Sequence, residues 1–370
     1  AEDGIRDNIP SLVGSEMCIR DSYKPGDLDA YVSVNHVRKN GLRKGDSVKG
    51  PIRPARNQEK FPALIRVDTV NGVSPEEARR RPKFEKLTPL FPDIRLRLET
   101  EEPGRVLPRI VDLVAPIGKG QRGLIVSPPK AGKTMLLEGI AQAIQATAPQ
   151  TRIVIVLIDE RPEEVTFFRR AVPGAEVFAS SADQRLQEHI DLAEWMLAHI
   201  RTELECGNDV VLLLDSLTRM TRSFNLSGAS RGRTLSGGLE AGAVEIPRRF
   251  FGLARNIEAG GSVTIVATVL VDTGSRLDQV IFEEFKGTGN SEIVLDRDLA
   301  DARIFPAINI TASGTRKEHL LYGPDEAQRI AWLRRKLAGR KPQQALEAVL
   351  RLMDQYPSNE ALLQSIPLGR

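Results

Sequence analysis

The chain has 370 residues, of which 41% are hydrophobic and 27% are charged, and its formal net charge is +3. These values are ordinary for a globular protein, and the sequence has neither an apolar run of membrane-spanning length nor a secretory signal pattern, so we expect a cytoplasmic protein without a membrane partner. Its two cysteines are too few for a disulfide framework or a cysteine-based zinc site, and the small net charge does not by itself indicate nucleic-acid binding.

The N-terminal part of the chain is predicted to be irregular at first and then rich in short strands. Residues 1–22 have no hydrophobic periodicity, and the string SLVGSEMCIRDS at 11–22 resembles translated sequencing-adaptor DNA. We therefore expect a non-native or disordered segment there. Within 23–75, β-rich runs at 29–34 and 61–70 are separated by Asn-Gly turn signals, which predicts part of a small β-barrel.

The remaining chain is predicted to be a linker followed by an α/β domain. Residues 76–109 are rich in Pro, Arg and Glu, which is typical of an ordered linker. From 110 to 370, near-continuous apolar runs alternate with helical patterns, for example at 186–204 and 324–363, and this indicates a mostly parallel sheet. The candidate strands are 123–126, 152–158, 210–214, 263–271 and 304–310.

A phosphate-binding loop is predicted between the strand at 123–126 and a helix at 135–145. Residues 128–134 (PPKAGKT) end in the Gly-Lys-Thr of a Walker A motif, although Ser127 stands where the first glycine is usual. Backbone N–H groups of such a loop and of the helix N-terminus bind phosphate oxygens. Lys133 would reach the β- and γ-phosphates of a nucleotide, and Thr134 would hold Mg²⁺.

Two acidic residues follow buried strands. Asp215 after 210–214 fits a Walker B acid, which helps to hold Mg²⁺; alone it could be a turn-forming aspartate, but the Walker A motif favours the first reading. Glu160 after 152–158 has two open readings: a carboxylate that activates water, or an N-cap or surface acid before a helix starting at Pro162. The histidines have no metal or catalytic spacing and are His36, His189, His199 and His319.

Five sequence blocks in a fixed order carry a resemblance to a known family. They are PPKAGKT (128–134), LIDERPEEV (157–165), LDSLTR (214–219), FKGTGN (285–290) and SGTRKE (313–318). Together they resemble the family of the bacterial transcription termination factor Rho, from about residue 23 to the C-terminus. The resemblance implies a RecA-like ATPase domain preceded by a partial OB-type β-barrel.

The resemblance also implies an activity and a set of partners. Members of the family are homo-hexameric rings that use ATP and Mg²⁺, bind single-stranded pyrimidine-rich RNA and move along it 5′ to 3′. They unwind RNA–DNA hybrids and release RNA from the RNA polymerase elongation complex. We therefore expect an RNA-stimulated ATPase and helicase.

In such a ring, the nucleotide would lie between neighbouring subunits. By this resemblance Glu160 would activate water with Arg161 beside it, and Arg316 would be an arginine finger that reaches the neighbour's site. The implied nucleotide-binding residues are Lys130, Ala131, Gly132, Lys133, Thr134, Asp215, Arg303 and Phe305. Lys130, Lys133 and Thr134 would contact phosphates and Mg²⁺, with Asp215 as the Walker B acid. Arg303 would also lie near the phosphates, and Phe305 would stack on adenine.

RNA would be held in two places. Two central-pore loops are implied, one at Arg233, Gly237 and Gly238 and one at Gly274 and Arg276, although either loop alone reads as a surface turn. In the barrel, the implied contacts are Tyr31, Glu59 and Phe61. Aromatic stacking there would contribute about 1–3 kcal/mol per base, whereas the aromatic rings could instead pack the barrel core.

The resemblance is incomplete at the N-terminus. The family has an N-terminal helical region and an aromatic strand that have no counterpart in 1–22, so we expect the barrel to lack its first strands. Two other functions therefore stay open: an RNA-binding assembly protein without motor output, and a RecA-like rotary or export ATPase. The export ATPase would share the Walker motifs but has no obvious need for Arg276.

Overall fold

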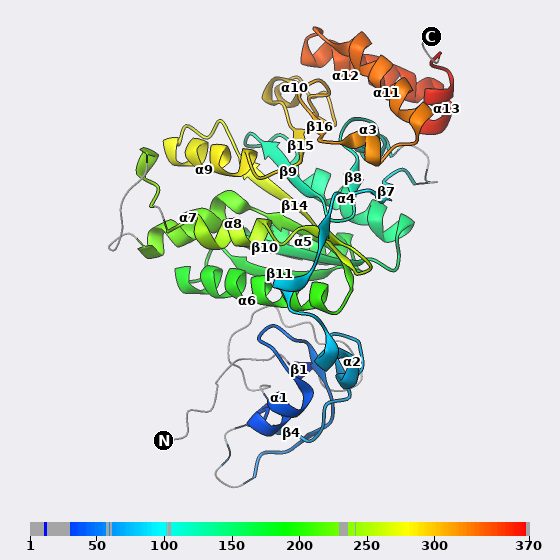
Figure 1. Cartoon of the computed structure of the whole chain (residues 1–370). Coiled ribbons are helices and arrows are strands. Elements are labelled where there is room, and N and C mark those ends of the chain that lie inside the picture. The colour runs from blue at the N-terminus through cyan, green and yellow to red at the C-terminus, as the bar shows by residue number, and fades with distance from the viewer. Residues whose placement is uncertain are drawn as a thin grey trace.

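Most of the chain forms a large β-sheet with helices on both faces (Figure 1). The structure, a computed structural model, describes residues 30–56, 59, 61–100, 102, 105–228, 236–240 and 242–367, and the backbone of Ser11–Leu12. The sheet has the order β11-β10-β12-β14-β9-β15-β16. These strands are β9 (Arg122–Ser127), β10 (Arg152–Glu160), β11 (Glu176–Ser181), β12 (Asp209–Asp215), β14 (Ser262–Leu270), β15 (Ser291–Val294) and β16 (Gly314–Thr315).

The sheet is mostly parallel, as predicted. All neighbours in this order are parallel except β15 and β16, which are antiparallel. Two further strands, β13 (Arg255–Ile257) and β6 (Pro89–Leu90), pair antiparallel beside β14. The carboxyl ends of the parallel strands therefore meet at one edge, where ligands of such sheets bind.

The long apolar strands follow from burial on both faces. In β10, Ile153, Ile155 and Leu157 join the hydrophobic core on one face of the sheet. The alternating residues, such as Val154 and Val156, join the core on the other face. Because successive side chains of a strand point to opposite faces, a strand between two helical layers must be apolar throughout.

Two helical layers complete these cores. One core includes residues of α3 (Val106–Val114), α4 (Lys133–Thr147), α5 (Pro162–Ala171), α10 (Arg297–Asp301), α11 (Pro324–Leu337), α12 (Pro342–Gln355) and α13 (Asn359–Gln364). The other includes residues of α6 (Leu186–Glu205), α7 (Leu217–Gly228), α8 (Glu245–Phe251) and α9 (Arg276–Lys286). The helices predicted at 135–145, 186–204 and 324–363 are confirmed. Among the described residues, no helix is long and apolar enough to cross a bilayer.

Two predicted strands are wrong. Residues 304–310 form no strand; only an isolated bridge joins Leu295 to Ile308, and Pro306 removes a backbone donor from the middle of the run. The β-rich run at 29–34 contributes only an isolated bridge from Tyr31 to Ala63. The chain then enters α1 (Val34–Asn40), because Ser33 caps its first turn and Gly41 ends it with φ of 62°.

The N-terminal part is a small unit of short strands beside the large sheet. It contains β1 (Ser11–Leu12), β2 (Val48–Lys49), β3 (Ile52–Arg53), β4 (Ala63–Leu64), β5 (Thr69–Val70) and α2 (Pro75–Arg80). β2 pairs antiparallel with β5 and β3 with β4, while β1 is parallel to β2. A separate small core includes Leu42, Val48 and Leu64. These pairings are consistent with a partial OB-type fold.

The stretch 76–109 contains several short elements for which its sequence shows few signals. It carries α2 from its second residue onward, the short 3-10 helix η1 (Phe84–Lys86), β6, β7 (Arg95–Leu96) and the start of α3. β7 pairs with β8 (Ile117–Gly118). Further on, the structure contains the 3-10 helices η2 (Ser236–Gly238) and η3 (Glu318–Leu320). Through β6 and β7, the stretch 76–109 therefore packs along the part of the chain that carries the large sheet.

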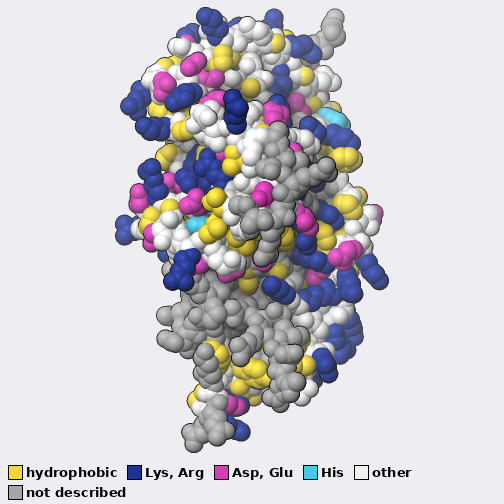
Figure 2. Space-filling model, turned by 90° about the vertical axis from the view of Figure 1, so that its left-hand side faces the viewer, with side chains coloured by type: hydrophobic (Ala, Val, Ile, Leu, Met, Phe, Trp, Pro, Cys, Tyr) yellow, Lys and Arg dark blue, Asp and Glu magenta, His cyan; other side chains and the backbone are white. Residues whose placement is uncertain are grey.

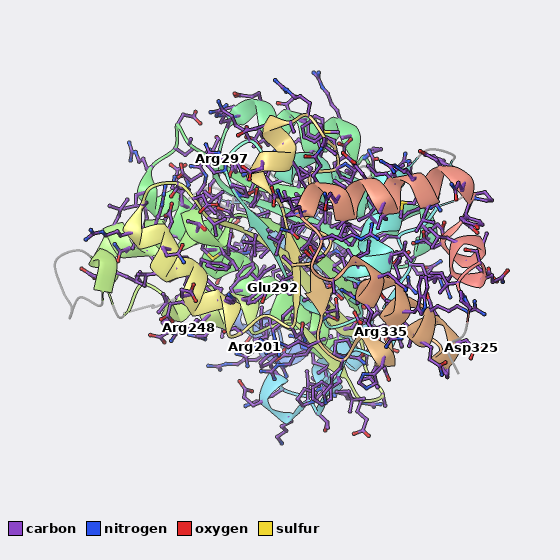
Figure 3. All side chains as sticks on the ribbon, turned by 90° about the horizontal axis from the view of Figure 1, so that it is seen from above. Arg201, Arg248, Glu292, Arg297, Asp325 and Arg335 are labelled. Atoms are coloured by element: carbon purple, nitrogen blue, oxygen red, sulfur yellow. The ribbon has the colours of Figure 1, made fainter. Side chains whose placement is uncertain are left out.

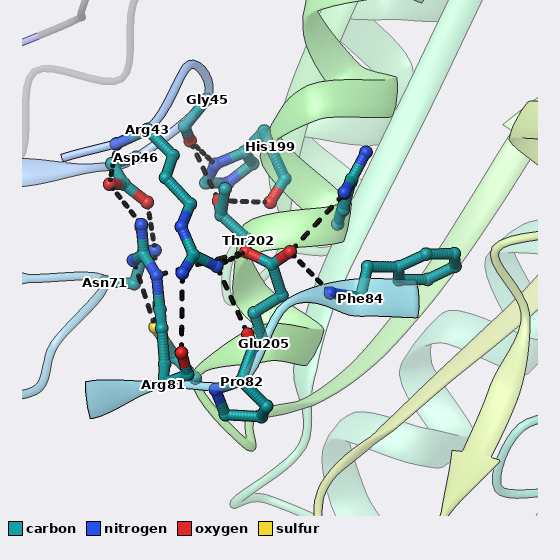
Figure 4. Close-up of polar contacts among 12 residues, drawn as sticks. Arg43, Gly45, Asp46, Asn71, Arg81, Pro82, Phe84, His199, Thr202 and Glu205 are labelled. Atoms are coloured by element: carbon teal, nitrogen blue, oxygen red, sulfur yellow. Dashed lines mark hydrogen bonds and ion pairs between the residues drawn. The ribbon is translucent and has the colours of Figure 1, made fainter. Parts of the chain in front are cut away.

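A buried polar network attaches the N-terminal unit to α6 (Figure 4). Arg81 Nη2 donates to Asp46 Oδ2 at 2.6 Å, and both side chains are almost fully buried. Asn71 donates to the other oxygen of Asp46 at 2.9 Å. From α6, Glu205 accepts from Arg43 at 2.5 Å, and His199 Nδ1 lies 2.8 Å from the Gly45 carbonyl oxygen. These contacts fix the two parts against each other.

Candidate active site

The predicted phosphate loop joins β9 to α4 at the carboxyl edge of the sheet. Gly132 occupies the N-cap position of α4 with φ of 95°, a conformation that favours glycine. No atom lies within 4 Å of the position that a Cβ on Gly132 would occupy. Glycine is therefore favoured here by the backbone conformation and not by a lack of space for a side chain. Lys130 is exposed and Ala131 is buried. The first N–H groups of α4 are therefore directed to a site that suits phosphate.

Lys133 lies between two carboxylates. Its Nζ is 2.8 Å from Glu160 Oε1 and 2.7 Å from Asp215 Oδ1. Burial lowers the pKa of Lys133, but the charges of Asp215 and Glu160 outweigh burial and raise it overall. The lysine is therefore firmly charged, as a phosphate-binding group must be.

Glu160 is the buried acid of this group. It ends β10, its side chain is 2% exposed, and Arg219 Nε also lies 3.0 Å from its Oε1. Burial and the neighbouring Asp215 raise the pKa of Glu160 to about 7, while Lys133 opposes the rise. A carboxylate with such a pKa can accept a proton from water near neutral pH.

The alternative readings of Glu160 are wrong. The N-cap position of α5 is held by Arg161, without a side-chain hydrogen bond to the helix, so Glu160 is not the cap. It is also too deeply buried for a surface acid. The side chain of Arg161 is exposed, and the cations that contact Glu160 are Lys133 and Arg219.

Asp215 is likewise not a surface turn residue. It is fully buried at the end of β12, and its Oδ1 accepts from Thr268 at 2.6 Å. Its Oδ2 has no hydrogen-bond partner among the described residues. Oxygen atoms of Asp215, Glu160 and Glu164 lie within 4.8 Å of one another, and Thr134 Oγ1 donates to Glu164 at 3.2 Å. Such hard oxygen donors suit a divalent cation such as Mg²⁺.

The two residues expected near the adenine and the phosphates, Arg303 and Phe305, reach the same edge of the sheet. Val294 at the end of β15 pairs with Val126 beside the phosphate loop, and the segment after α10 returns to β15 through the hydrogen bond from Asn309 N to Val294 O at 2.8 Å. Arg303 and Phe305 lie on this segment; Phe305 is 51% exposed. The register of the sheet therefore places Arg303 and Phe305 near the edge that carries the phosphate loop.

Arg316 lies at the opposite end of the same strands. It follows β16, in which Thr315 pairs with Ser291, and Ser291 pairs with Gly123 at the start of β9. Along β9, the four steps from Gly123 to Ser127 cover about 13 Å at 3.3 Å per residue, and this distance separates Arg316 from the start of the phosphate loop. Arg316 is exposed. It therefore does not join the cluster around Lys133 within its own chain.

The two candidate pore loops lie against each other. A Cβ on Gly237 would be 3.2 Å from the Arg276 carbonyl oxygen, so the 3-10 helix η2 packs on the start of α9. Gly237, Gly238 and Gly274 all have positive φ, which favours glycine. Arg276 is exposed, whereas Arg233 is outside the described residues.

One helix links these loops to the carboxylates. From α7, Arg219 contacts Glu160, and Arg222 Nε donates to Asp278 of α9 at 2.8 Å. One turn further on, Asn225 Nδ2 donates to the Gly238 carbonyl oxygen at 3.2 Å. The same helix therefore contacts the cluster around Lys133 and both candidate RNA loops.

The three barrel residues have different environments. Tyr31 is 54% exposed, so its expected alternative role in the barrel core is wrong. Its N–H donates to the Pro62 carbonyl oxygen at 2.6 Å, which places it beside Phe61, a half-buried residue. Glu59 forms two hydrogen bonds with Arg53 at 2.6 and 2.7 Å, and these hold the pKa of Glu59 at about 2.

Three residues of the cluster were not singled out from the sequence. Arg219 and Glu164 each lie one helical turn after a strand-ending acid, and that spacing is a signal that could have identified them. Thr268 lies in the middle of an apolar strand and offers no comparable signal. Its position beside Asp215 depends on the order of β12 and β14.

Two protein-family sequence models match the chain. The nucleotide-binding domain of the ATP synthase alpha/beta family matches residues 108–315, and the RNA-binding domain of Rho termination factor matches 15–76. Among solved structures, an ATPase from the type III secretion system of pathogenic bacteria has a TM-score of 0.62 at 22% identity, covering 76% of this chain and 87% of that one. This likeness confirms the RecA-like fold.

Curated relatives extend the match to nearly the whole chain. Transcription termination factor Rho of Streptomyces lividans is 56% identical over 348 residues, which are 93% of this chain and 49% of that protein. The chain thus spans about half the length of this relative. Transcription termination factor Rho of Aquifex aeolicus is 50% identical over 98% of this chain and 84% of its own length. The chain therefore belongs to the family of transcription termination factor Rho.

Proposed function

We propose that the chain is the motor of an RNA-dependent ATPase that terminates transcription. The observation that carries this proposal is the position of Lys133 between Glu160 and Asp215, at the carboxyl edge of a RecA-like sheet. Such a group supplies the charges that phosphoryl transfer requires. The proposed organisation is an RNA-binding unit at 23–75, a connecting stretch at 76–109 and a motor at 110–370.

Each residue of the cluster has a defined task in ATP hydrolysis. Lys133, with Lys130 and the backbone of the loop, would bind the β- and γ-phosphates. Thr134 and Asp215 would hold Mg²⁺, which neutralises phosphate charge when bound. Glu160 would accept the proton of the water that attacks the γ-phosphate. Phosphates would draw Lys133 away from Glu160, so nucleotide binding would free this carboxylate for water.

The site would be completed by a second copy of the chain. Arg316 is exposed and far from its own phosphate loop, which supports a role in the site of a neighbouring subunit. Two apolar side chains near Arg316 are exposed to solvent, Phe91 at 61% and Leu320 at 39%. The ammonium group of Lys317, the residue after Arg316, lies over the Phe91 ring. Apolar exposure of this kind is typical of an interface. We propose a hexameric ring with Arg161, Arg303 and Phe305 at the nucleotide.

The same ring would hold RNA in its centre. Gly237, Gly238, Gly274 and Arg276 form one flexible cationic surface that suits a moving contact with phosphates and does not read bases; Arg233 would belong to it. Tyr31, Phe61 and Glu59 would hold pyrimidine-rich RNA in the N-terminal unit. Pulling on nascent RNA would release it from RNA polymerase, in the cytoplasm.

Strand displacement tests this proposal. The oligomeric chain is mixed with an RNA–DNA hybrid that carries a 5′ single-stranded RNA tail, and release of the labelled DNA strand is followed with ATP. The proposal predicts release with ATP, and no release with Lys133→Ala or with a non-hydrolysable analogue. ATP-independent binding of RNA without strand release would instead support an RNA-binding assembly protein and contradict the motor.

A further inference from the structure

A cleft lies where the N-terminal unit meets the ATPase domain. Its volume is about 1040 Å³, at the upper end of the ~300–1,000 Å³ that is common for ligand sites. One wall contains Arg43 and Lys44, and the facing wall contains residues of α6, η1 and the segment from α8 to β13. Figure 3 shows Arg201, one of the α6 residues, on the side of the molecule where the N-terminal unit lies.

The cleft carries an excess of positive charge. Its lining contains six cationic and three acidic side chains, a net charge of +3. Two of the acids are already paired: Glu205 contacts Arg43 at 2.5 Å and Arg201 at 3.4 Å, and Glu85 contacts Arg201 at 2.5 Å. On the face drawn in Figure 2, Lys and Arg side chains also gather beside the junction of the two parts.

Three cations of the cleft have no acidic partner among the described residues: Lys44, Arg249 and Arg255. Lys44 and Arg249 are exposed and come from opposite walls. Arg255 is half-buried, with its guanidinium 4.2 Å from the centre of the Phe84 ring. Burial and the nearby Arg122 lower the pKa of Arg255, so an anion in the cleft would compensate a charge that the protein leaves unpaired.

The rest of the lining suits nucleic-acid bases. Leu197, Ile246 and Leu253 add apolar surface. The guanidinium of Arg201 lies 5.3 Å from the centre of the Phe84 ring, so both Arg201 and Arg255 pack on this aromatic residue. Unpaired bases stack on aromatic rings and guanidinium planes. One wall belongs to the segment that matches an RNA-binding domain.

We propose that this cleft binds the phosphate backbone of single-stranded RNA between the N-terminal unit and the ATPase domain. The inference rests on the proposed function, because it adds a third contact to a strand that the N-terminal unit and the pore loops would also hold. A contact with phosphates would be independent of sequence. It would also hold the RNA close to the surface of α6 and α8.

Salt-dependent RNA binding tests this inference. Binding of fluorescently labelled oligo(C) to the full chain is measured by anisotropy over a range of salt concentrations, for the wild type and for the double variant Arg249→Ala/Arg255→Ala. Loss of two phosphate contacts should make the slope of log K against log salt shallower by about 1.4 and weaken binding on the order of tenfold at ~0.1 M salt. The charge-conserving pair Arg249→Lys/Arg255→Lys should keep the slope.

Matched controls separate the cleft from general charge and from folding. Arg335→Ala/Arg340→Ala removes the same charge from exposed positions in α11 and just after it, and should bind as the wild type does. The C-terminal helices lie at the end of the molecule opposite the N-terminal unit (Figure 1). Because Arg255 packs on Phe84, thermal unfolding is measured for each variant. Lys44→Ala/Arg249→Ala changes only exposed side chains and should reproduce the shallower slope without loss of fold.

The outcomes distinguish this inference from the function on which it rests. If the wild type binds no RNA, the proposed function fails and the cleft inference fails with it. If the wild type binds RNA and both cleft variants bind with unchanged affinity and slope, only the cleft inference is overturned. Binding of poly-glutamate that depends on Arg249 and Arg255, with RNA binding unaffected, would also overturn it and assign the cleft to an acidic protein.

Discussion

Arg219 forms an ion pair with Glu160, with 3.0 Å between Nε of the arginine and Oε1 of the glutamate, and its Nη1 donates to Asp159 at 3.1 Å. The arginine belongs to the first turns of α7, whereas both acids belong to the end of β10. The orientation of the proposed water-activating carboxylate therefore depends on the helix that also contacts the candidate RNA loops.

Arg219→Ala is predicted to lower ATP turnover by roughly 10- to 100-fold, as is usual when a group that orients a reacting side chain is removed. The substitution also removes a positive charge that lowers the pKa of Glu160. The acidic limb of the pH–rate profile should therefore move to higher pH. Arg219→Lys should keep part of the activity, and Arg170→Ala, an exposed arginine of α5, should have no effect. An unshifted profile in Arg219→Ala would contradict this role.

The raised pKa of Glu160 predicts a specific dependence of stability on pH. Between the ordinary value of 4.5 and the folded value of about 7, the folded protein holds a proton that the unfolded chain has released. Stability from this group therefore falls as pH rises through that window and is steady below it. The difference in unfolding free energy between wild type and Glu160→Gln, measured by urea denaturation from pH 4.5 to 8, should follow this course. Glu163→Gln controls for loss of an exposed acid nearby, and a pH-independent difference would refute the prediction.

Arg316 is predicted to act in the site of another subunit. Arg316→Ala and Lys133→Ala should each abolish ATP turnover. Rings that contain both variants should hydrolyse some of the bound ATP in a single turnover. At some of their interfaces, an Arg316→Ala subunit supplies an intact phosphate loop and a Lys133→Ala subunit supplies an intact Arg316. The measurement is single-turnover phosphate release, with subunit mixing verified by native mass spectrometry. No recovery in verified mixed rings would indicate that both residues must lie in one chain.

The buried pair Asp46–Arg81 is predicted to be a major contribution to the stability of the junction between the N-terminal unit and the connecting stretch. Asp46→Ala leaves Arg81, whose side chain is 2% exposed, without its hydrogen-bonded carboxylate and with only Glu205 at 3.9 Å. This loss should cost about 3–5 kcal/mol. The matched control is Asp68→Ala, which breaks a pair whose side chains are 72% and 43% exposed and should change stability by no more than about 0.5 kcal/mol. Equal losses in the two variants, measured by urea denaturation, would be inconsistent with this account.

Much of the sheet could be predicted because its signal is local. β10 and β12 are long apolar runs that a two-sided sheet requires, and the phosphate loop follows from the residues between β9 and α4. The helix α1 was missed although Ser33 and Gly41 signal both of its ends, because the valines nearby suggested a strand. The strand prediction at 304–310 is wrong for the same reason. Apolar composition alone does not distinguish a strand from a packed irregular segment.

The pairings between distant residues could not be predicted. Asp46 and Arg81 are 35 positions apart and Arg219 lies 59 positions after Glu160, and each contact depends on how whole elements pack. Thr268 becomes part of the site only because β12 and β14 are neighbours. A resemblance to a family implies roles for residues within shared motifs. Contacts between residues of different elements, such as Asp46 with Arg81, are seen only in the structure.

Phosphate release from ATP with and without poly(C) tests the central claim most directly. An RNA-driven motor predicts that the oligomeric chain hydrolyses ATP slowly alone and much faster with poly(C), and that Glu160→Gln removes both activities. Hydrolysis that is equally fast without RNA would contradict the account and would favour an export-type ATPase with the same fold.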